Sequence, residues 1–219
     1  MEKIKKAVVY PPLEEKINVI SHAIGLLLSV LALILLIVYS STYGNAWHIV
    51  SAIIFGLSLI TLYSASTIYH STKDPIIRQR LRIFDHAAIY VLIAGTYTPI
   101  TLVVLNGTTG WILFALVWGM ALIGIILKLF FTGRYNLLST IMYVAMGWLV
   151  VFAVNPLIES LDPAGLYWLA AGGIFYTVGA FLYSRKSLAF NHAIFHIFVL
   201  FGSFCHFIAV FYYVLPPSL

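Results

Sequence analysis

The sequence predicts an all-α integral membrane protein, a bundle of seven transmembrane helices with its amino terminus in the cytosol and its carboxyl terminus outside. The first observation is composition: 62% of the 219 residues are hydrophobic and only 9% are charged. The mean hydropathy of +1.02 lies far outside the range of soluble domains. The lengths of the apolar runs and the placement of the charges are the other two observations.

Seven apolar runs are long enough to cross a bilayer as helices, which takes about 20 residues. The connections between them are short, so we expect one seven-transmembrane domain over residues 17–215, preceded by a cytosolic segment at 1–16. The first run is too long for the core of a signal peptide, and no small-residue cleavage site follows it, so we expect it to remain as a span. The runs lie near 17–39, 46–70, 84–105, 110–131, 137–154, 165–184 and 190–214.

The basic residues occupy alternate connections. All twelve Lys and Arg fall in the leader, at the edges of spans, or in the connections after the second, fourth and sixth runs. In the other connections and the tail after 214, the only charged residues are Glu159 and Asp162. Positive charge in the cytosol therefore predicts a cytosolic amino terminus in the plasma membrane. The net charge of +5 is explained by this topology and by anionic lipid, so we expect no nucleic-acid partner.

Ionisable side chains are predicted to gather at one depth near the cytosolic face. Counting turns from the cytosolic ends places Asp85 at the start of the third span and the other groups within a few turns of the same face. Such groups in a span usually face the bundle interior or a watery cavity, which makes them functional candidates. The set is His22, His70, Asp85, His86, His192 and His196.

The pair His192 and His196 has the spacing of a metal chelate, because residues four apart share one helical face. A third imidazole would complete a zinc site that leaves one position for water. His70 and Asp85 at the same depth favour this hypothesis, since imidazole and carboxylate combine in such sites. Alternatively, the rings only hydrogen-bond to neighbouring helices. His206 lies ten residues beyond His196, about 15 Å along the helix, and cannot share its metal.

Two further spacings accompany the histidines. Ser66 lies four residues before His70, on the same helical face. Glu15, Asn18 and His22 form an i, i+3, i+7 stripe that would face one direction as the first span enters the bilayer. Ser66 could instead only bind a backbone carbonyl, and Glu15 with Asn18 could only begin a helix.

Several segments, taken in order, carry a family resemblance: "EEKINVISHAIG", "STIYHS", "DHAAIYVLIAGTYTPITL", "MGWLVV" and "NHAIFHIFVLFGSFCHF". They closely resemble the hemolysin III branch of the progestin and adiponectin receptor superfamily, also called membrane homeostasis proteins in bacteria. The resemblance implies that His70, His192 and His196 are zinc ligands, that Asp85 holds the water at the zinc, and that Ser66 supports it. The superfamily is also similar to alkaline ceramidases, which are zinc-dependent amide hydrolases.

The leading hypothesis is a zinc hydrolase that acts in membrane lipid homeostasis. It would cleave the amide or ester of a lipid at the cytosolic leaflet, with Asp85 as general base and the acyl chain between the helices. An alternative is a non-catalytic sensor, similar to a receptor, in which zinc ties the second and seventh spans together. A pore-forming hemolysin is disfavoured, because a conducting path needs polar groups along its full depth.

Overall fold

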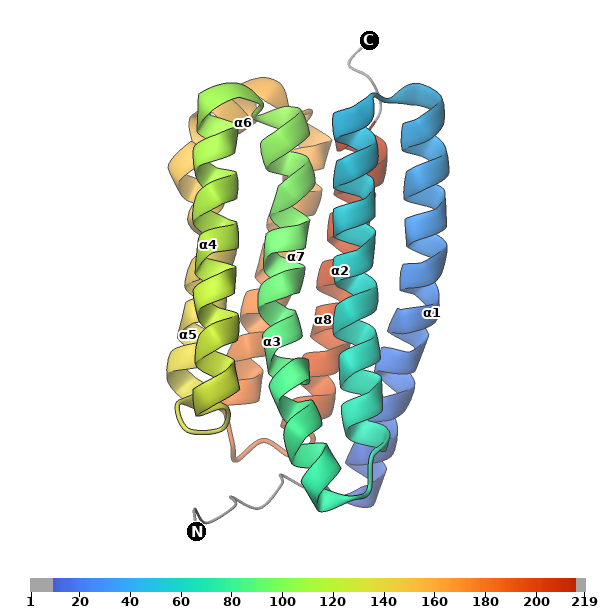
Figure 1. Cartoon of the computed structure of the whole chain (residues 1–219), viewed down its shortest axis with the longest axis vertical. Helices are drawn as coiled ribbons and strands as arrows, with labels where there is room; N and C mark the ends of the chain where they lie inside the picture. The colour runs from blue at the N-terminus through green and yellow to red at the C-terminus, as the bar shows by residue number, and fades with distance from the viewer. Residues whose placement is uncertain (1–9, 216–219) are drawn as a thin grey trace.

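Figure 1 shows a computed structural model in which the helices run side by side along one axis. It describes residues 10–215, so residues 1–9 of the predicted cytosolic segment lie outside it. Seven described segments are long and apolar enough to cross a membrane, which confirms the predicted all-α bundle. The elements are α1 (Pro12–Tyr43), α2 (Ala46–Ser71), α3 (Pro75–Pro99), η1 (Ile100–Val104), α4 (Gly107–Phe131), α5 (Asn136–Gly147), η2 (Leu149–Ala153), α6 (Val154–Ser160), α7 (Pro163–Ser184), α8 (Asn191–Ala209) and η3 (Val210–Val214).

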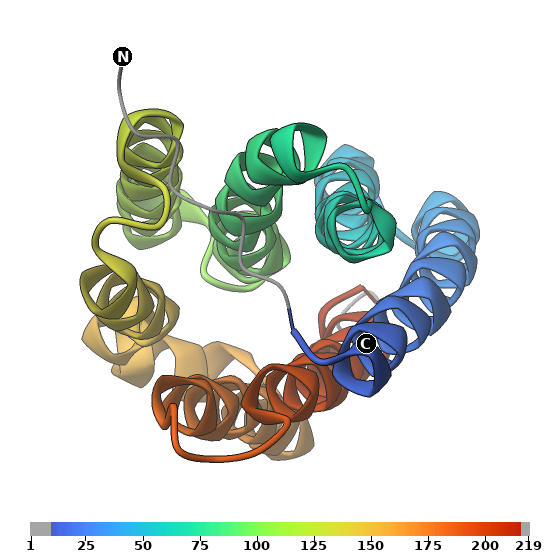
Figure 2. The same cartoon turned by 90° about the horizontal axis from the view of Figure 1, so that it is seen from below.

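The crossing helices form a ring, which Figure 2 shows from below. Neighbours in sequence pack together along α1, α2, α3 and α4, and α7 packs on α8. The ring closes where α1 also packs against α8. We call the end where α1 begins the amino-terminal end of the bundle; α3 and α8 begin there and α2 ends there (Figure 1). The first and last crossings therefore lie side by side at that end.

The third crossing begins earlier than its apolar run predicts. Asp74 caps α3 by accepting two backbone N–H groups at 2.9 Å, and Pro75 occupies the first helical position. Both are favourable at a helix start. The arginines expected in the connection before residue 84 therefore lie on the first turns of α3. The expectation that Asp85 starts the span was wrong, because ten residues of α3 precede it.

The fifth crossing is longer than the predicted run 137–154 and is broken into α5, η2 and α6. Pro156 contributes to the break, because a proline has no N–H to donate within a helix. The hydroxyl of Tyr97 satisfies backbone groups at the break, donating to the Gly147 carbonyl and accepting from the Val150 N–H, both at 2.8 Å. Side chains of neighbouring helices commonly rescue freed backbone groups within a membrane in this way.

Gly95 brings α2 and α3 close together. A Cβ added at Gly95 would lie 2.4 Å from the Cβ of Ser58, whereas one added at Gly119 on α4 would meet nothing within 4 Å. Small residues permit such close approach of membrane helices. This contact fixes α2, which carries His70, against α3, which carries Asp85.

Candidate metal centre

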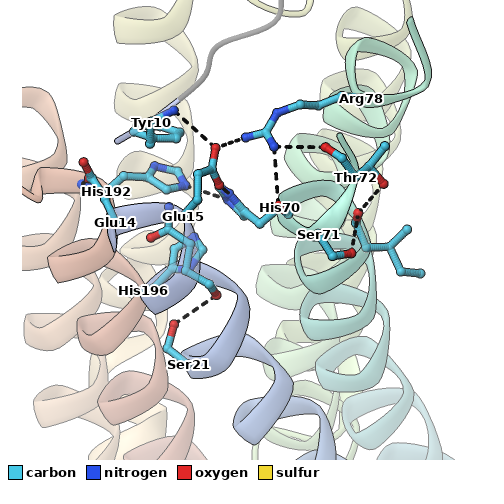
Figure 3. Close-up of polar contacts among 12 residues, drawn as sticks. Tyr10, Glu14, Glu15, Ser21, His70, Ser71, Thr72, Arg78, His192 and His196 are labelled. Atoms are coloured by element: carbon cyan, nitrogen blue, oxygen red, sulfur yellow. Dashed lines mark hydrogen bonds and ion pairs between the residues drawn. The ribbon is translucent and has the colours of Figure 1, made fainter. Parts of the chain in front are cut away.

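Three histidines converge at the amino-terminal end of the bundle (Figure 3). His70 comes from the last turn of α2, and His192 and His196 come from the first two turns of α8. All three are buried, and their candidate ligand atoms lie within 4.8 Å of one another. The two Nε2 atoms of His70 and His192 are 3.0 Å apart. The structure thus brings together the three histidines that the sequence nominated.

The donor set fits a transition-metal ion. Two Zn–N bonds of about 2.0–2.1 Å at a tetrahedral angle separate their nitrogens by about 3.3 Å, close to the observed approach of His70 and His192. The Nδ1 of His192 is buried and has no hydrogen-bond partner among the described residues. Three imidazoles accept zinc and also other divalent transition metals, so the donors fit the class of ion rather than one element.

Glu15 holds His70 in one orientation. Its Oε2 accepts a hydrogen bond from His70 Nδ1 at 2.8 Å, and its Oε1 pairs with Arg78 and accepts the Tyr10 N–H at 3.2 Å. With Nδ1 donating, the neutral His70 ring presents the lone pair of Nε2 to the cluster. Carboxylates commonly orient metal-binding histidines in this way. Arg78 also donates to the His70 carbonyl at 3.4 Å, a role that the sequence analysis missed.

Glu14 holds the start of α8, which carries the other two histidines. Phe190 at the N-cap has φ 57° and offers no side-chain cap, so the first N–H groups of α8 need other acceptors. Glu14 Oε1 accepts the His192 N–H at 3.2 Å. A carboxylate is favourable at a helix amino terminus. The sequence analysis did not consider Glu14, although its place beside Glu15 in "LEEK" was the available signal.

The predicted stripe on α1 does face the histidines. The His22 ring stacks on His196 with centroids 3.5 Å apart and planes inclined by 7°. The Asn18 carbonyl lies 3.4 Å from His196 Nδ1. Neither ring nitrogen of His22 has a hydrogen-bond partner among the described residues. Together with Glu15, these residues place one face of α1 against the histidine cluster.

Tyr10 covers the cluster at the amino-terminal end. Its ring stacks on His192 with centroids 4.6 Å apart and planes inclined by 21°. Burial raises the pKa of the Tyr10 phenol, so the ring remains neutral at physiological pH. Tyr10 precedes the first apolar run, and the sequence analysis did not include it.

Asp85 and Ser66 lie on the wall of a cavity of about 140 Å³ that His192 and His196 also line. Ser66 Oγ is buried without a partner among the described residues. Asp85 Oδ2 is 3.6 Å from His86 Nδ1, and no hydrogen bond or ion pair in the described part of the chain joins it to the three histidines. His70 is not on this wall; it lines a separate pocket with Tyr10, Glu15 and Arg78.

The family model for "Haemolysin-III related" proteins matches residues 11–207. The chain belongs to the hemolysin III family. It is 51% identical over 200 residues to the hemolysin-3 homolog of Bacillus subtilis (strain 168), covering 91% of this chain and 94% of that one. It is 48% identical over 205 residues to hemolysin-3 of Bacillus cereus, covering 94% of each. It is also 30% identical over 178 residues to the human monocyte to macrophage differentiation factor, covering 77% and 72%.

The region matched by the hemolysin III model contains every residue of the candidate centre except Tyr10. His206 also lies in this region but takes no part in the centre. Its Nε2 donates to the Leu169 carbonyl at 3.2 Å on the neighbouring helix α7. The prediction that His206 does not join His196 at a metal is consistent with this contact.

In this hemolysin III protein, the groups around His70 and the groups on the cavity wall lie on two different sides of the histidine cluster. Toward the amino-terminal end, charged groups of α1 and α3 surround His70. Toward the bundle interior, the Asp85 carboxylate, the Ser66 hydroxyl and the imidazoles of His192 and His196 are among the polar groups that line a mostly apolar cavity. A metal ion held between the two regions would therefore have acceptor groups and room for an apolar molecule on one side.

Proposed function

We propose that this protein is a zinc-dependent hydrolase of lipid amides or esters that acts in membrane lipid homeostasis. The observation that carries the proposal is three buried histidines with ligand atoms within 4.8 Å of one another, two of which, His192 and His196, line the same cavity as Asp85 and Ser66. His70, His192 and His196 would hold the ion. The alternation of basic connections supports placing the site at the cytosolic leaflet of the plasma membrane.

When bound, zinc would supply Lewis-acid polarisation of the scissile carbonyl and acidify a water molecule. The chain's own groups would do the rest. The Asp85 carboxylate would accept a proton from the attacking water as the new C–O bond forms, then return it to the leaving nitrogen or oxygen as the amide or ester bond breaks. Ser66 Oγ would donate a hydrogen bond to the substrate carbonyl. The products are a fatty acid and an amine or alcohol.

The apolar wall of the cavity supports a lipid as the substrate. Beyond the histidines the wall is formed by side chains such as Leu92, Ile93 and Val199, and it reaches the break in the fifth crossing at Trp148. An acyl chain would bury its methylenes there and exclude bulk water from the reacting carbonyl, which strengthens the electrostatic effect of Asp85.

The test is Asp85→Asn, which keeps the shape of the side chain and removes the base. We expect hydrolysis of N-acyl and O-acyl lipids by zinc-loaded protein in nanodiscs to fall by about 10² to 10⁴-fold. Metal content and melting temperature should stay at the wild-type values. Asp162→Asn is the matched control, because Asp162 caps α7 and asparagine caps a helix equally well. Unchanged hydrolysis in Asp85→Asn would overturn the proposed role of Asp85.

A non-catalytic, zinc-stabilised sensor is the second candidate. It is favoured by one observation: no hydrogen bond or ion pair in the described residues joins Asp85 to the histidines, while Glu14 and Glu15 tie the cluster to α1. In that case the metal would join α2 to α8 and no substrate would be turned over. Any effect of Asp85→Asn would then follow metal content or stability. We do not propose a pore, because Asp85, Lys128 and the histidines on the cavity wall other than His206 lie near the amino-terminal end.

A further inference from the structure

The cavity beside the histidines contains a lysine that the proposed hydrolysis does not use. Lys128 lies in the last turn of α4, is 4% exposed and lines the cavity. Its Nζ donates to Ser139 Oγ at 2.5 Å and lies 5.7 Å from the centre of the Tyr143 ring. Ser139 and Tyr143 line the same cavity. No carboxylate oxygen among the described residues lies within 4.0 Å of this ammonium group.

A buried ammonium group without an anionic partner is unfavourable. Removing the charge from water has a large free-energy cost, which a hydroxyl and an aromatic ring offset only in part. The end of α4 provides some compensation, because a cation is favourable at a helix carboxyl terminus. A molecule bound in the cavity would nevertheless be close to the positively charged Lys128 ammonium group.

Arg82 places a second positive charge near Lys128. The guanidinium extends from α3 to the connection between α4 and α5, where its Nη1 lies 2.9 Å from the position of a Cβ added at Gly133. Burial and then the charge of Arg82 lower the pKa of Lys186 in the connection between α7 and α8. Arg82 is therefore close to the connection between α4 and α5 and affects the charge of Lys186 in the connection between α7 and α8.

The balance of charge at this end of the cavity is positive. Lys186 Nζ lies 3.9 Å from the ring centre of Tyr183, which lines the cavity. Asp85 is the single carboxylate among the described lining residues. Lys128 on the wall, with Arg82 and Lys186 close to it, thus places positive charge at one end of a cavity whose lining is otherwise mostly apolar.

We propose that Lys128 and Arg82 bind the anionic head group of an acyl lipid, a phosphate or a carboxylate, whose chain lies in the cavity. The proposal rests on the proposed function in that it takes a lipid as the cavity's occupant. It narrows the substrate class to lipids with an anionic group near the reacting carbonyl. The acyl chain would extend along the apolar wall toward Trp148 and Gly173.

Two ether lipids that cannot be hydrolysed provide the test. 1-O-hexadecylglycerol 3-phosphate and uncharged 1-O-hexadecylglycerol differ only in the phosphate, and their Kd values are measured by displacement of a fluorescent fatty acid from protein in phosphatidylcholine nanodiscs. We expect the phosphate lipid to bind wild-type protein at least about tenfold more tightly, since charge-assisted hydrogen bonds have about this effect. Equal affinity of the two lipids would overturn the proposal.

Lys128→Met and Arg82→Gln remove one charge each while keeping the length of the side chain. Each should reduce the preference for the phosphate lipid to about threefold or less, given the strength of one such contact. Arg80→Gln is the matched control, because Arg80 lies on the same turns of α3 and is exposed. If Lys128→Met lowers the melting temperature but keeps the wild-type preference, the lysine only stabilises the end of α4 and the proposal fails.

Two further binding measurements test whether the bound molecule is a lipid and whether its chain lies in the cavity. Glycerol 3-phosphate that displaces the probe as strongly as the phosphate lipid would indicate a site for the free anion and would exclude a lipid site. Gly173→Leu narrows the far end of the cavity, and the variant should fold because a Cβ there meets only the Trp148 ring at 3.5 Å. It should weaken binding of the hexadecyl lipid and spare an octyl analogue. Lipid binding can be measured without hydrolysis, so the two proposals can fail separately. Asp85→Asn should lose hydrolysis but keep the preference for the phosphate lipid.

Discussion

His70 and His192 approach with their Nε2 atoms 3.0 Å apart, although 122 residues separate them in the sequence. Glu15 accepts the hydrogen bond of His70 Nδ1, so the Nε2 of a neutral His70 ring has no hydrogen to donate. The short approach is compatible with a hydrogen bond between the two Nε2 atoms or with a cation between the two rings. With His196 beside the pair, this close approach forms a set of three imidazoles that a metal ion could join.

Purified wild-type protein should hold about one metal ion per chain, as a single tetrahedral site requires. His192→Ala/His196→Ala should lose it, because one imidazole cannot retain the ion. His206→Ala is the matched control: it removes a histidine from the same helix whose ring contacts only the Leu169 carbonyl and neighbouring side chains. Elemental mass spectrometry measures the content. Folded, chelator-free protein without metal would exclude a resident metal site.

Glu15→Gln should weaken metal binding by about 10- to 100-fold, the usual effect of losing a carboxylate that orients a histidine ligand. The glutamine can still accept a hydrogen bond from His70 but carries no charge to balance the metal and Arg78. Competition with a chromogenic chelator measures the affinity. Glu159→Gln, an exposed change in α6, should leave it unchanged. Equal affinity in Glu15→Gln and wild type would contradict the role given to Glu15.

Chelation should lower the melting temperature, and zinc should restore it. A ligand that binds only the folded state stabilises it by about 2.7 kcal/mol at 100 times its Kd. The site joins α2 to α8, so the effect should be seen in the main unfolding transition of the bundle. Scanning fluorimetry in detergent measures it, and the double histidine variant should show no response to zinc. A zinc response that persists in that variant would place the stabilising ion elsewhere.

Glu14→Ala should destabilise the bundle by about 1 kcal/mol, the typical cost of losing a helix cap. Phe190, the N-cap residue, has no side-chain acceptor that could replace the Glu14 carboxylate, so the His192 N–H would lose its acceptor. Glu14→Gln should recover most of the loss because an amide oxygen also accepts a hydrogen bond. Equilibrium unfolding in mixed micelles compares the variants. Equal stability of Glu14→Ala and wild type would show that this contact contributes little.

Gly95→Ala should lower stability by about 1–3 kcal/mol, the usual cost of overpacking. The added Cβ would lie 2.4 Å from the Cβ of Ser58, so α2 and α3 must move apart. Gly119→Ala is the matched control, because a Cβ there meets nothing within 4 Å; a gain in helix propensity should leave it neutral or slightly more stable. Thermal unfolding of both variants tests the difference.

The sequence was sufficient to predict the crossings and the convergence of the histidines, because both depend on properties that are local in the chain. Apolar length identifies a span, and the alternation of charged connections places His70 and His192 at the same end of the bundle. Asp85 was misplaced along its helix because the arginine-rich turns before it are helical without being apolar. Hydropathy therefore located the apolar part of α3 and missed its start.

The stripe of Glu15, Asn18 and His22 could be predicted from its spacing, but the other groups that support the histidines could not, because their contacts are between distant segments. Glu14 is hydrogen-bonded to a residue 178 positions away, and no local pattern distinguishes it from an ordinary acidic residue at the start of a helix. Tyr10 and Arg78 likewise gain their roles only when α1, α2 and α3 pack at one end. The charge of Lys128 was noticed as a topology signal, and only the structure shows that it lines the cavity.

The placement of the three histidines also has a consequence for biogenesis. A ribosome delivers His70 early, but its two partners lie on the seventh crossing and arrive near the end of synthesis. Glu14 on α1 must wait in the membrane for that crossing before it can accept the His192 N–H. A chain that stops short, or inserts its final helix the wrong way round, lacks the complete ligand set. Metal retention would therefore report that all seven crossings have been inserted and assembled.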